Sequence, residues 1–262
     1  MWEKELSAAR QAARKSGKII NDLFGKISSI GKKGEIDLVT EADLLSDRII
    51  VEIIGRRFPR DSILIEEGGE SGRDSWRQWI IDPLDGTTNF VHSFPFFAVS
   101  IALRVDDELV LGVVYNPVMN EYFEAVKGEG AFLNKAPIRV SQTGDLKESL
   151  VATGFPYSVY KEPESMIELF KRMIVRVQGV RRPGAASLDL CYVASGRLDG
   201  FWEEGLHPWD TAAGSIIVME AGGIVSDYRG GAYSPFQKSI VAANPIIHPK
   251  MLEVLSIGYR PV

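Results

Sequence analysis

Acidic residues gather in one short segment, where a hydrophobic run enters a turn. Trp79-Ile-Ile is followed by Asp82, and Asp85 comes shortly after, just before Gly86 and Thr87. Two carboxylates on one turn could share a hard divalent cation, because Mg²⁺ prefers oxygen ligands in octahedral geometry. The amides of Gly86 and Thr87, at the expected start of a helix, would point where an anion sits. The segment predicts a place where magnesium and phosphate meet, although an ordinary acidic turn uses the same residue types.

Three other acids could join that turn. A short apolar strand precedes Glu66, so this carboxylate also stands at the end of a strand. Thr40 and Asp43 have the spacing of a helix capping box, which leaves Asp43 free to cap a helix, take part in chemistry, or do both. Asp210 stands near the start of an apolar helix, where the helix dipole favours an acid. We expect these acids to converge on the turn, and helix capping is the alternative explanation for the last two.

Composition narrows the class of protein. The 262 residues carry a net charge of −5, and no long basic run indicates nucleic-acid binding. No apolar run approaches the ~18 residues that cross a bilayer, and the N-terminal segment lacks a signal-peptide core, so we expect a cytoplasmic protein without membrane contact. Cys191 is the only cysteine, which excludes an internal disulfide. We interpret the three scattered histidines as structural, and zinc is therefore not indicated.

The hydrophobic pattern predicts the elements that must hold these acids in place. Apolar residues at helical spacing indicate helices over residues 3–24 and 40–58, separated by a Gly- and Lys-rich loop over residues 28–37. Strands are expected over residues 79–81, 98–105, 109–115 and 121–126. Together, these strands should form an antiparallel meander that packs on helices.

From about residue 145 onwards, strands and helices alternate, which is typical of an α/β unit. The predicted strands cover residues 150–153, 179–181, 199–202, 224–227 and 240–243, and the predicted helices cover residues 163–177, 186–195, 209–221 and a last stretch from residue 249. We expect an N-terminal α+β domain over residues 1–145, which carries most of the acids, and a C-terminal α/β domain over residues 146–262, which supplies Asp210. A pocket between them would be a common place for a small molecule.

Taken in order, these segments resemble the inositol monophosphatase family. The string Asp-Pro-Leu-Asp-Gly-Thr-Thr-Asn from Asp82 to Asn89 is highly specific. The other matching segments are weak singly and strong as an ordered set: Asp37–Asp43, Glu66-Glu67, Gly128–Phe132, Trp209-Asp210 and Glu220–Gly223. The resemblance runs from about residue 3 to residue 256. It implies a layered α-β-α-β-α sandwich of the inositol monophosphatase and fructose-1,6-bisphosphatase type, usually a homodimer.

The resemblance also implies roles for individual residues. The metal ligands would be Glu66, Asp82, the backbone carbonyl of Leu84, Asp85 and Asp210. The catalytic residues that orient and activate the attacking water would be Glu66, Asp43 and Thr87. The substrate-binding residues would be Asp85, Gly86, Thr87, Gly184, Ala185, Ala186, Glu203 and Asp210, of which Gly86 and Thr87 bind phosphate. Arg181, on the pocket rim, and Lys32, on a loop, are weaker candidates.

The implied activity is Mg²⁺-dependent hydrolysis of a small phosphate monoester, myo-inositol monophosphate first among them. We expect direct in-line attack by a metal-activated water, with two or three Mg²⁺ ions, Mn²⁺ as an alternative ion and Li⁺ as an inhibitor. Other substrates left open are fructose 1,6-bisphosphate, histidinol phosphate and a 3′-phosphoadenosine nucleotide. In a different class, the chain could be a binding partner of the bacterial transcription machinery. A binding-only role would predict loss of the metal acids, and here all are present.

Two departures from the family pattern bear on specificity. Ile65 stands where many members have glycine before the paired acids, and the Gly-rich stretch from Gly68 follows. The segments Thr153–Pro156 and Arg181–Gly184 are more similar to bacterial members than to animal ones. Strict specificity for inositol is therefore not implied.

Overall fold

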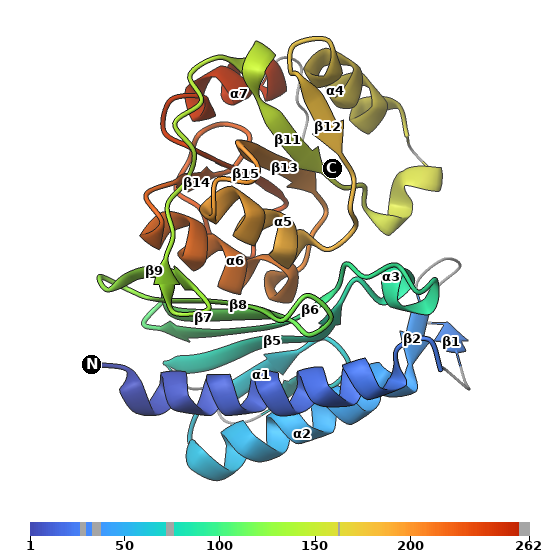
Figure 1. The fold of residues 1–262 in the computed structure, drawn as a ribbon, viewed down its shortest axis with the longest axis vertical. Coiled ribbons are helices and arrows are strands. Elements are labelled where there is room, and N and C mark those ends of the chain that lie inside the picture. The colour runs from blue at the N-terminus through green and yellow to red at the C-terminus, as the bar shows by residue number, and fades with distance from the viewer. Residues whose placement is uncertain (27–29, 33–37, 72–75, 162, 257–262) are drawn as a thin grey trace.

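The protein folds into five stacked layers in the order helices, sheet, helices, sheet, helices (Figure 1). This computed structural model describes residues 1–26, 30–32, 38–71, 76–161 and 163–256. The layering confirms the α-β-α-β-α sandwich that the sequence predicts. It also brings the acidic segments around Asp82 and Asp210, which lie far apart in the sequence, to the middle of the stack.

The first layer is a pair of helices, α1 (Glu3–Leu23) and α2 (Glu41–Arg57), which pack together and cover one face of the larger sheet. The buried stripe of α1 is rich in alanine, so its backbone lies close to its neighbours. The capping box predicted at Thr40 and Asp43 starts α2. The helix ends at Phe58, next to Pro59, which cannot continue it.

The larger sheet has eight strands in the order β10-β9-β8-β7-β6-β5-β3-β4. The strands are β3 (Ser62–Ile65), β4 (Gly69–Ser71), β5 (Arg77–Asp85), β6 (Ala98–Val105), β7 (Glu108–Asn116), β8 (Glu121–Val126), β9 (Gly130–Leu133) and β10 (Ala136–Pro137). All neighbours are antiparallel except β3 and β5. Asp106 and Asp107 join β6 to β7 with positive φ at both positions, as a tight hairpin requires.

The middle layer holds two buried helices, α5 (Ala186–Ala194) and α6 (Pro208–Glu220). Helix α6 is buried along most of its length because it contacts strands of both sheets. The second sheet has the order β12-β11-β13-β15-β14, and α4 and α7 form the outer layer. These elements are β11 (Leu150–Thr153), β12 (Gly179–Arg181), β13 (Gly200–Glu204), β14 (Ile224–Ser226), β15 (Ser239–Ala243), α4 (Glu164–Ile174) and α7 (His248–Leu255).

Two local predictions were wrong, and one strand was not predicted. The expected loop over residues 28–37 contains β1 (Ile30–Lys32), which pairs with β2 (Leu38–Thr40), and residues 27–29 and 33–37 lie outside the described part. The Gly-rich stretch after Glu67 forms β4 at the sheet edge. Strand β5 does not end at Asp82 but continues to Asp85.

Two further points complete the fold. A short helix, α3 (Thr87–Val91), follows β5 directly, and single 3₁₀ turns cover Leu146–Glu148 and Tyr157–Tyr160. No helix in the described ranges combines the length and apolar character needed to cross a bilayer. The boundary expected at residue 145 stays a prediction.

Candidate metal and phosphate site

The end of β5 carries the densest group of predicted site residues. Asp82 lies opposite Ser100 of β6 and Asp85 opposite Ala98, so β5 has one extra residue in this interval. Such an irregularity bends a strand and redirects its side chains. The amide of Leu84 donates to Asp82 Oδ1 at 2.9 Å, which fixes the turn from within. The acids therefore belong to a strand held in the sheet rather than to a free loop.

Buried carboxylates from distant parts of the chain act on one another at this point. Burial raises the pKa of Asp82 well above its usual range, and the charges of Glu66, Asp85 and Asp210 raise it further. Burial also raises the pKa of Asp210, with Asp85 and Glu66 adding to the effect. The pKa of Asp85 is raised to about 7, mainly by burial and despite hydrogen bonds from Ser187. The four predicted acids thus share one region, as the sequence analysis expected.

The chemistry of this group fits a magnesium ion. All the donors are oxygens, and ionised carboxylates buried together carry a large cost unless a cation compensates their charge. Within the described residues, no group of three or more acidic, histidine or cysteine side chains is arranged to hold a metal ion by itself. Mg²⁺ usually binds through one or two carboxylates, with water and substrate phosphate completing the shell. The assignment of metal ligands therefore stays a prediction.

Asp43 and Thr87 form a hydrogen-bonded pair beside the acids. Asp43 Oδ2 accepts from the amide and the hydroxyl of Thr40, at 2.8 and 2.6 Å, which completes the capping box of α2. The hydroxyl of Thr87 lies 2.9 Å from Asp43 Oδ1 and 3.0 Å from the carbonyl oxygen of Leu84. Burial raises the pKa of Asp43 while the bonds from Thr40 and Thr87 lower it. Asp43 therefore caps its helix and also holds Thr87, so both of its predicted uses are geometrically compatible.

Asp85 joins the two halves of the chain. Its Oδ2 accepts from the amide of Ser187 at 2.8 Å and from the Ser187 hydroxyl at 2.5 Å. Helix α5 has no side-chain cap from its own N-cap residue, Ala185. A carboxylate at the start of a helix satisfies free amides and is favoured by the helix dipole. The acid from β5 thus serves as the cap of a helix more than a hundred residues later in the chain.

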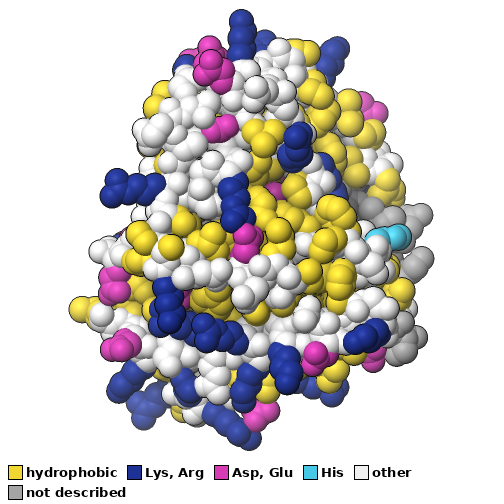
Figure 2. Space-filling view, viewed as in Figure 1, with side chains coloured by type: hydrophobic (Ala, Val, Ile, Leu, Met, Phe, Trp, Pro, Cys, Tyr) yellow, Lys and Arg dark blue, Asp and Glu magenta, His cyan; other side chains and the backbone are white. Residues whose placement is uncertain are grey.

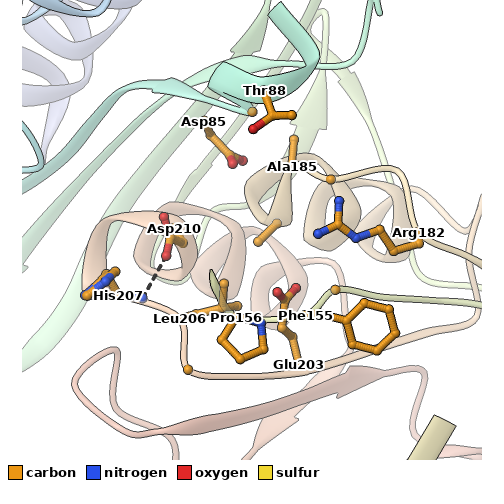
Figure 3. A pocket seen from close by; sticks show the side chains of 15 residues that line it. Asp85, Thr88, Phe155, Pro156, Arg182, Ala185, Glu203, Leu206, His207 and Asp210 are labelled. Atoms are coloured by element: carbon orange, nitrogen blue, oxygen red, sulfur yellow. Dashed lines mark hydrogen bonds between the residues drawn. The ribbon is translucent and has the colours of Figure 1, made fainter. Parts of the chain in front are cut away.

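A pocket opens beside these residues and is lined from both halves (Figure 3). Its lining residues are Asp85, Gly86, Thr88, Gly154, Phe155, Pro156, Arg182, Gly184, Ala185, Ala186, Glu203, Gly205, Leu206, His207 and Asp210. Figure 3 shows Asp85 and Thr88 on one side and Glu203 with Phe155 on the other. The cavity therefore runs from the metal acids towards the second sheet.

Glu203 gives the far side of the pocket its polar character. Burial raises its pKa to about 8, with Arg182 lowering it and Asp85 raising it. A Cβ on Gly154 would lie only 2.2 Å from the Glu203 carboxylate oxygens, so glycine at this position leaves room for the Glu203 side chain. A carboxyl group with such a pKa is largely protonated at neutral pH and can both donate to and accept from hydroxyl groups.

Most predicted substrate-binding residues line the pocket, with two shifts. Thr87 is buried and is not among the lining residues, whereas the neighbouring Thr88 is. Arg181 is exposed and is not among the lining residues, whereas Arg182 is. Lys32 ends β1, and its side chain lies outside the described part of the structure.

The sequence analysis missed several lining residues, of which Leu206 and His207 are the most informative. His207 was interpreted as structural, and its ring does stack on Trp209 with centroids 4.8 Å apart. Its amide also donates to Asp210 Oδ2 at 2.7 Å, a bond visible in Figure 3. The three-residue spacing of His207 and Asp210 is that of a capping box, which places both residues at the same helix start. Because Asp210 was a predicted site residue, this spacing could have indicated that His207 also lies at the pocket.

The chain matches known proteins over nearly its full length. A profile described as the inositol monophosphatase family matches residues 1–258. The chain belongs to the inositol monophosphatase family. It is 47% identical to the inositol-1-monophosphatase of Synechocystis sp. over 96% of this chain and 88% of that protein. It is 44% identical to the Nus factor SuhB of Escherichia coli, covering 94% of each.

Solved structures of other inositol monophosphatase family members share the fold. The extragenic suppressor protein SuhB from Bartonella henselae superposes with a TM-score of 0.93 at 41% identity, covering 98% of this chain and all of that chain. An inositol monophosphatase from Anabaena superposes with a TM-score of 0.90 at 39% identity, covering 99% of this chain and 98% of that one. The family implies a phosphatase that acts on a small phosphorylated molecule.

Proposed function

We propose that this protein hydrolyses phosphate monoesters of small polyols or sugars, with myo-inositol monophosphate as the foremost substrate and Mg²⁺ as the cofactor. The observation that carries the proposal is the group of four interacting acids, Glu66, Asp82, Asp85 and Asp210, of which Asp85 and Asp210 line a pocket. The other end of this pocket holds Glu203, which suits hydroxyl groups. A phosphorylated polyol has a phosphate group for the acidic end of the pocket and hydroxyl groups for the end that holds Glu203.

In this proposal Glu66, Asp82, Asp85, Asp210 and the carbonyl of Leu84 hold the metal. The bound metal supplies Lewis-acid stabilisation of phosphate charge and lowers the pKa of water. The amides of Gly86 and Thr87 donate hydrogen bonds to the phosphate oxygens. Thr87, held by Asp43, orients the attacking water, and Glu66 helps to remove its proton.

The attack would come directly from water, without a phosphoenzyme. A covalent route needs a nucleophile with an adjacent base. The chain's only cysteine, Cys191, is fully buried, and burial raises the pKa of its thiol well above its usual range. Cys191 is therefore unsuited to attack phosphate.

The far side of the pocket would recognise the alcohol part of the substrate. Glu203 accepts from or donates to ring hydroxyls, and the segment Gly184–Ala186 contacts them through its backbone. Arg182 adds a positive charge near Glu203. Phe155 and Leu206 add apolar surface to the lining, against which the carbon face of a ring can pack.

Further properties belong to the same proposal. We infer that two or three Mg²⁺ ions bind during turnover, that Mn²⁺ can replace them and that Li⁺ inhibits. We also infer a homodimer that works in the cytoplasm without membrane or nucleic acid.

The proposal is tested by phosphate release from a panel that includes myo-inositol monophosphate and fructose 1,6-bisphosphate, with and without Mg²⁺. We expect Mg²⁺-dependent release by the natural chain, highest on myo-inositol monophosphate, and none by Asp82→Asn. Asp22→Asn, a surface change of the same kind, is the matched control and should retain full activity. Undiminished release by Asp82→Asn would refute the metal assignment.

A second candidate function rests on the relatives that are named Nus factor SuhB. Under it, the chain also binds a component of the bacterial transcription machinery. Co-migration with a purified bacterial elongation complex on a sizing column tests this role. Asp82→Asn should still co-migrate, because it changes a buried acid and leaves the surface intact; absence of binding by the natural chain would remove this second role.

A further inference from the structure

Two of the segments that line the pocket are not joined to each other by strand pairing among the described residues. Thr88 lines it from α3, directly after the metal-binding turn, while Arg182, Gly184 and Ala185 line it from the loop between β12 and α5. These two segments belong to different halves of the chain. Any substrate that touches both needs their separation to be fixed to within a fraction of an ångström.

The side chain of Asn89 supplies a direct tie between them. Its Nδ2 donates to the carbonyl oxygen of Pro183 at 2.8 Å and to that of Phe96 at 2.7 Å, with the carbonyl of Gly184 at 3.3 Å. An amide nitrogen has two hydrogens, so the two short bonds use both of them. One side chain on α3 thus holds both the segment before β6 and the loop before α5.

The loop lies close against Asn89. Gly184 has φ of +91°, which favours glycine, and a Cβ at this position would lie 3.4 Å from both terminal atoms of Asn89 and 3.0 Å from Arg182. The contact with Asn89 would be an ordinary van der Waals contact, so the positive φ is what requires glycine here. The loop is therefore held in place by the hydrogen bonds that Asn89 donates to it.

We propose that Asn89 is a positioning residue that sets the alcohol-recognising side of the pocket in register with the phosphate side. Asp85 ties down the start of α5 through Ser187, and Asn89 ties down the loop that precedes it. Asn89 itself does not line the pocket in the described structure. It acts through Arg182, Gly184 and Ala185, and this inference rests on the proposed function for the identity of the substrate.

Loss of the Asn89 hydrogen bonds should affect binding on the two sides of the pocket to different degrees. Removing the donors of Asn89 frees the loop but leaves the hydrogen bonds of Asp85 and Thr87 in place. Binding of the whole substrate should weaken, because displacement by about 1 Å can cost on the order of 100-fold. Binding of inorganic phosphate alone should change little, because it needs only the phosphate side.

The test compares the natural chain with Asn89→Ala and with Asn89→Asp, which keeps the shape but has no donor. We expect KM for myo-inositol monophosphate to rise about 10-fold or more, while inhibition by inorganic phosphate changes less than about 3-fold. Asn244→Ala is the matched control, because Asn244 also donates to a distant backbone carbonyl, that of Thr143, and lies outside the pocket. It should lower stability without altering this ratio. Equal changes in both constants, or no change in either, overturn the positioning role.

Hydrogen exchange tests the tie without any substrate. In both Asn89 variants, the amides of Arg182, Gly184 and Ala185 should exchange faster, while those of Ser187 and of β5 keep their natural rates. Unchanged exchange in the loop would overturn the inference even if the enzyme is active. Absence of phosphate release by the natural chain would instead contradict the proposed function, and the exchange result would still decide whether Asn89 holds the loop.

Discussion

At the scale of single residues, Thr87 contacts the carboxylate that caps α2 and is also the residue proposed to orient the attacking water. Its hydroxyl reaches Asp43 Oδ1 and the Leu84 carbonyl, so its lone pairs point away from both and can accept from water. Asp43 is held by Thr40 through two bonds, which leaves it little freedom to move. The same carboxylate therefore serves the fold and orients Thr87.

Thr87→Ala should lower kcat by about 100-fold while leaving KM within about 3-fold, because an orienting hydroxyl matters more in the transition state than in binding. Thr87→Ser keeps the hydroxyl and should recover most of the activity. Steady-state kinetics with myo-inositol monophosphate checks both variants. A kcat for Thr87→Ala equal to that of the natural chain would remove this role.

At the scale of elements, the sequence predicted most helices and strands because their hydrophobic patterns are local. It missed β1 and β4, which are three-residue strands whose existence depends on β2 and β3 as partners. It ended β5 too early because Asp82 and Pro83 are poor strand residues. Here Ser46 of α2 bonds the Pro83 carbonyl at 2.8 Å, and pairing with β6 resumes at Asp85.

The acids of the candidate site could be predicted because they form an ordered set of motifs along the sequence. The residues on the substrate side of the pocket could not, because the path of the backbone decides which of two adjacent residues of the same type lines the pocket. Both Arg181, which ends β12, and Arg182 are exposed, but only Arg182 lines the pocket. Likewise Thr88, rather than Thr87, lines the cavity because α3 buries Thr87. Neither outcome is encoded in residue type or spacing.

The packing of α6 on β7 gives an element-scale prediction. A Cβ at Gly112 would lie 2.6 Å from the Ala213 carbonyl oxygen and 2.5 Å from Ile216 Cγ2, so helix and strand would have to separate. Gly112→Ala should lower the free energy of unfolding by about 1–3 kcal/mol. Gly55→Ala, in α2 with open space around it, should raise it by up to about 1 kcal/mol. Denaturant unfolding measures both, and a neutral Gly112→Ala would contradict the close packing.

The start of α7 gives a prediction about pH. Burial lowers the pKa of His248 below its ordinary value of 6.5, and its Nε2 lies 2.9 Å from the Ser226 hydroxyl. The unfolded chain then binds a proton more readily than the folded one, so this contribution to stability is complete above about pH 6.5 and is lost as the pH falls below it. Between pH 7 and pH 5, melting temperature should fall more in the natural chain than in His248→Gln. Parallel curves would show that His248 does not titrate this way.

At the scale of the whole molecule, the five layers concentrate negative charge at their centre. Glu66 follows β3, Asp82 and Asp85 come from β5, and Asp210 comes from α6. The larger sheet and helix α6 must both be in place before these acids meet. The folded protein therefore carries an electrostatic cost that a bound cation would relieve, which links metal binding to global stability.

Thermal unfolding of the natural chain and of Asp82→Asn, each with EDTA and with Mg²⁺, tests this central claim most directly. Without metal, Asp82→Asn should melt at a higher temperature than the natural chain, because a neutral amide avoids the cost of burying an acid among other acids, while the acceptor for Leu84 remains. With Mg²⁺ the order should reverse, because only the natural chain gains stability as the ion concentration rises. A natural chain whose melting temperature ignores Mg²⁺, or a variant that gains as much, would contradict the account.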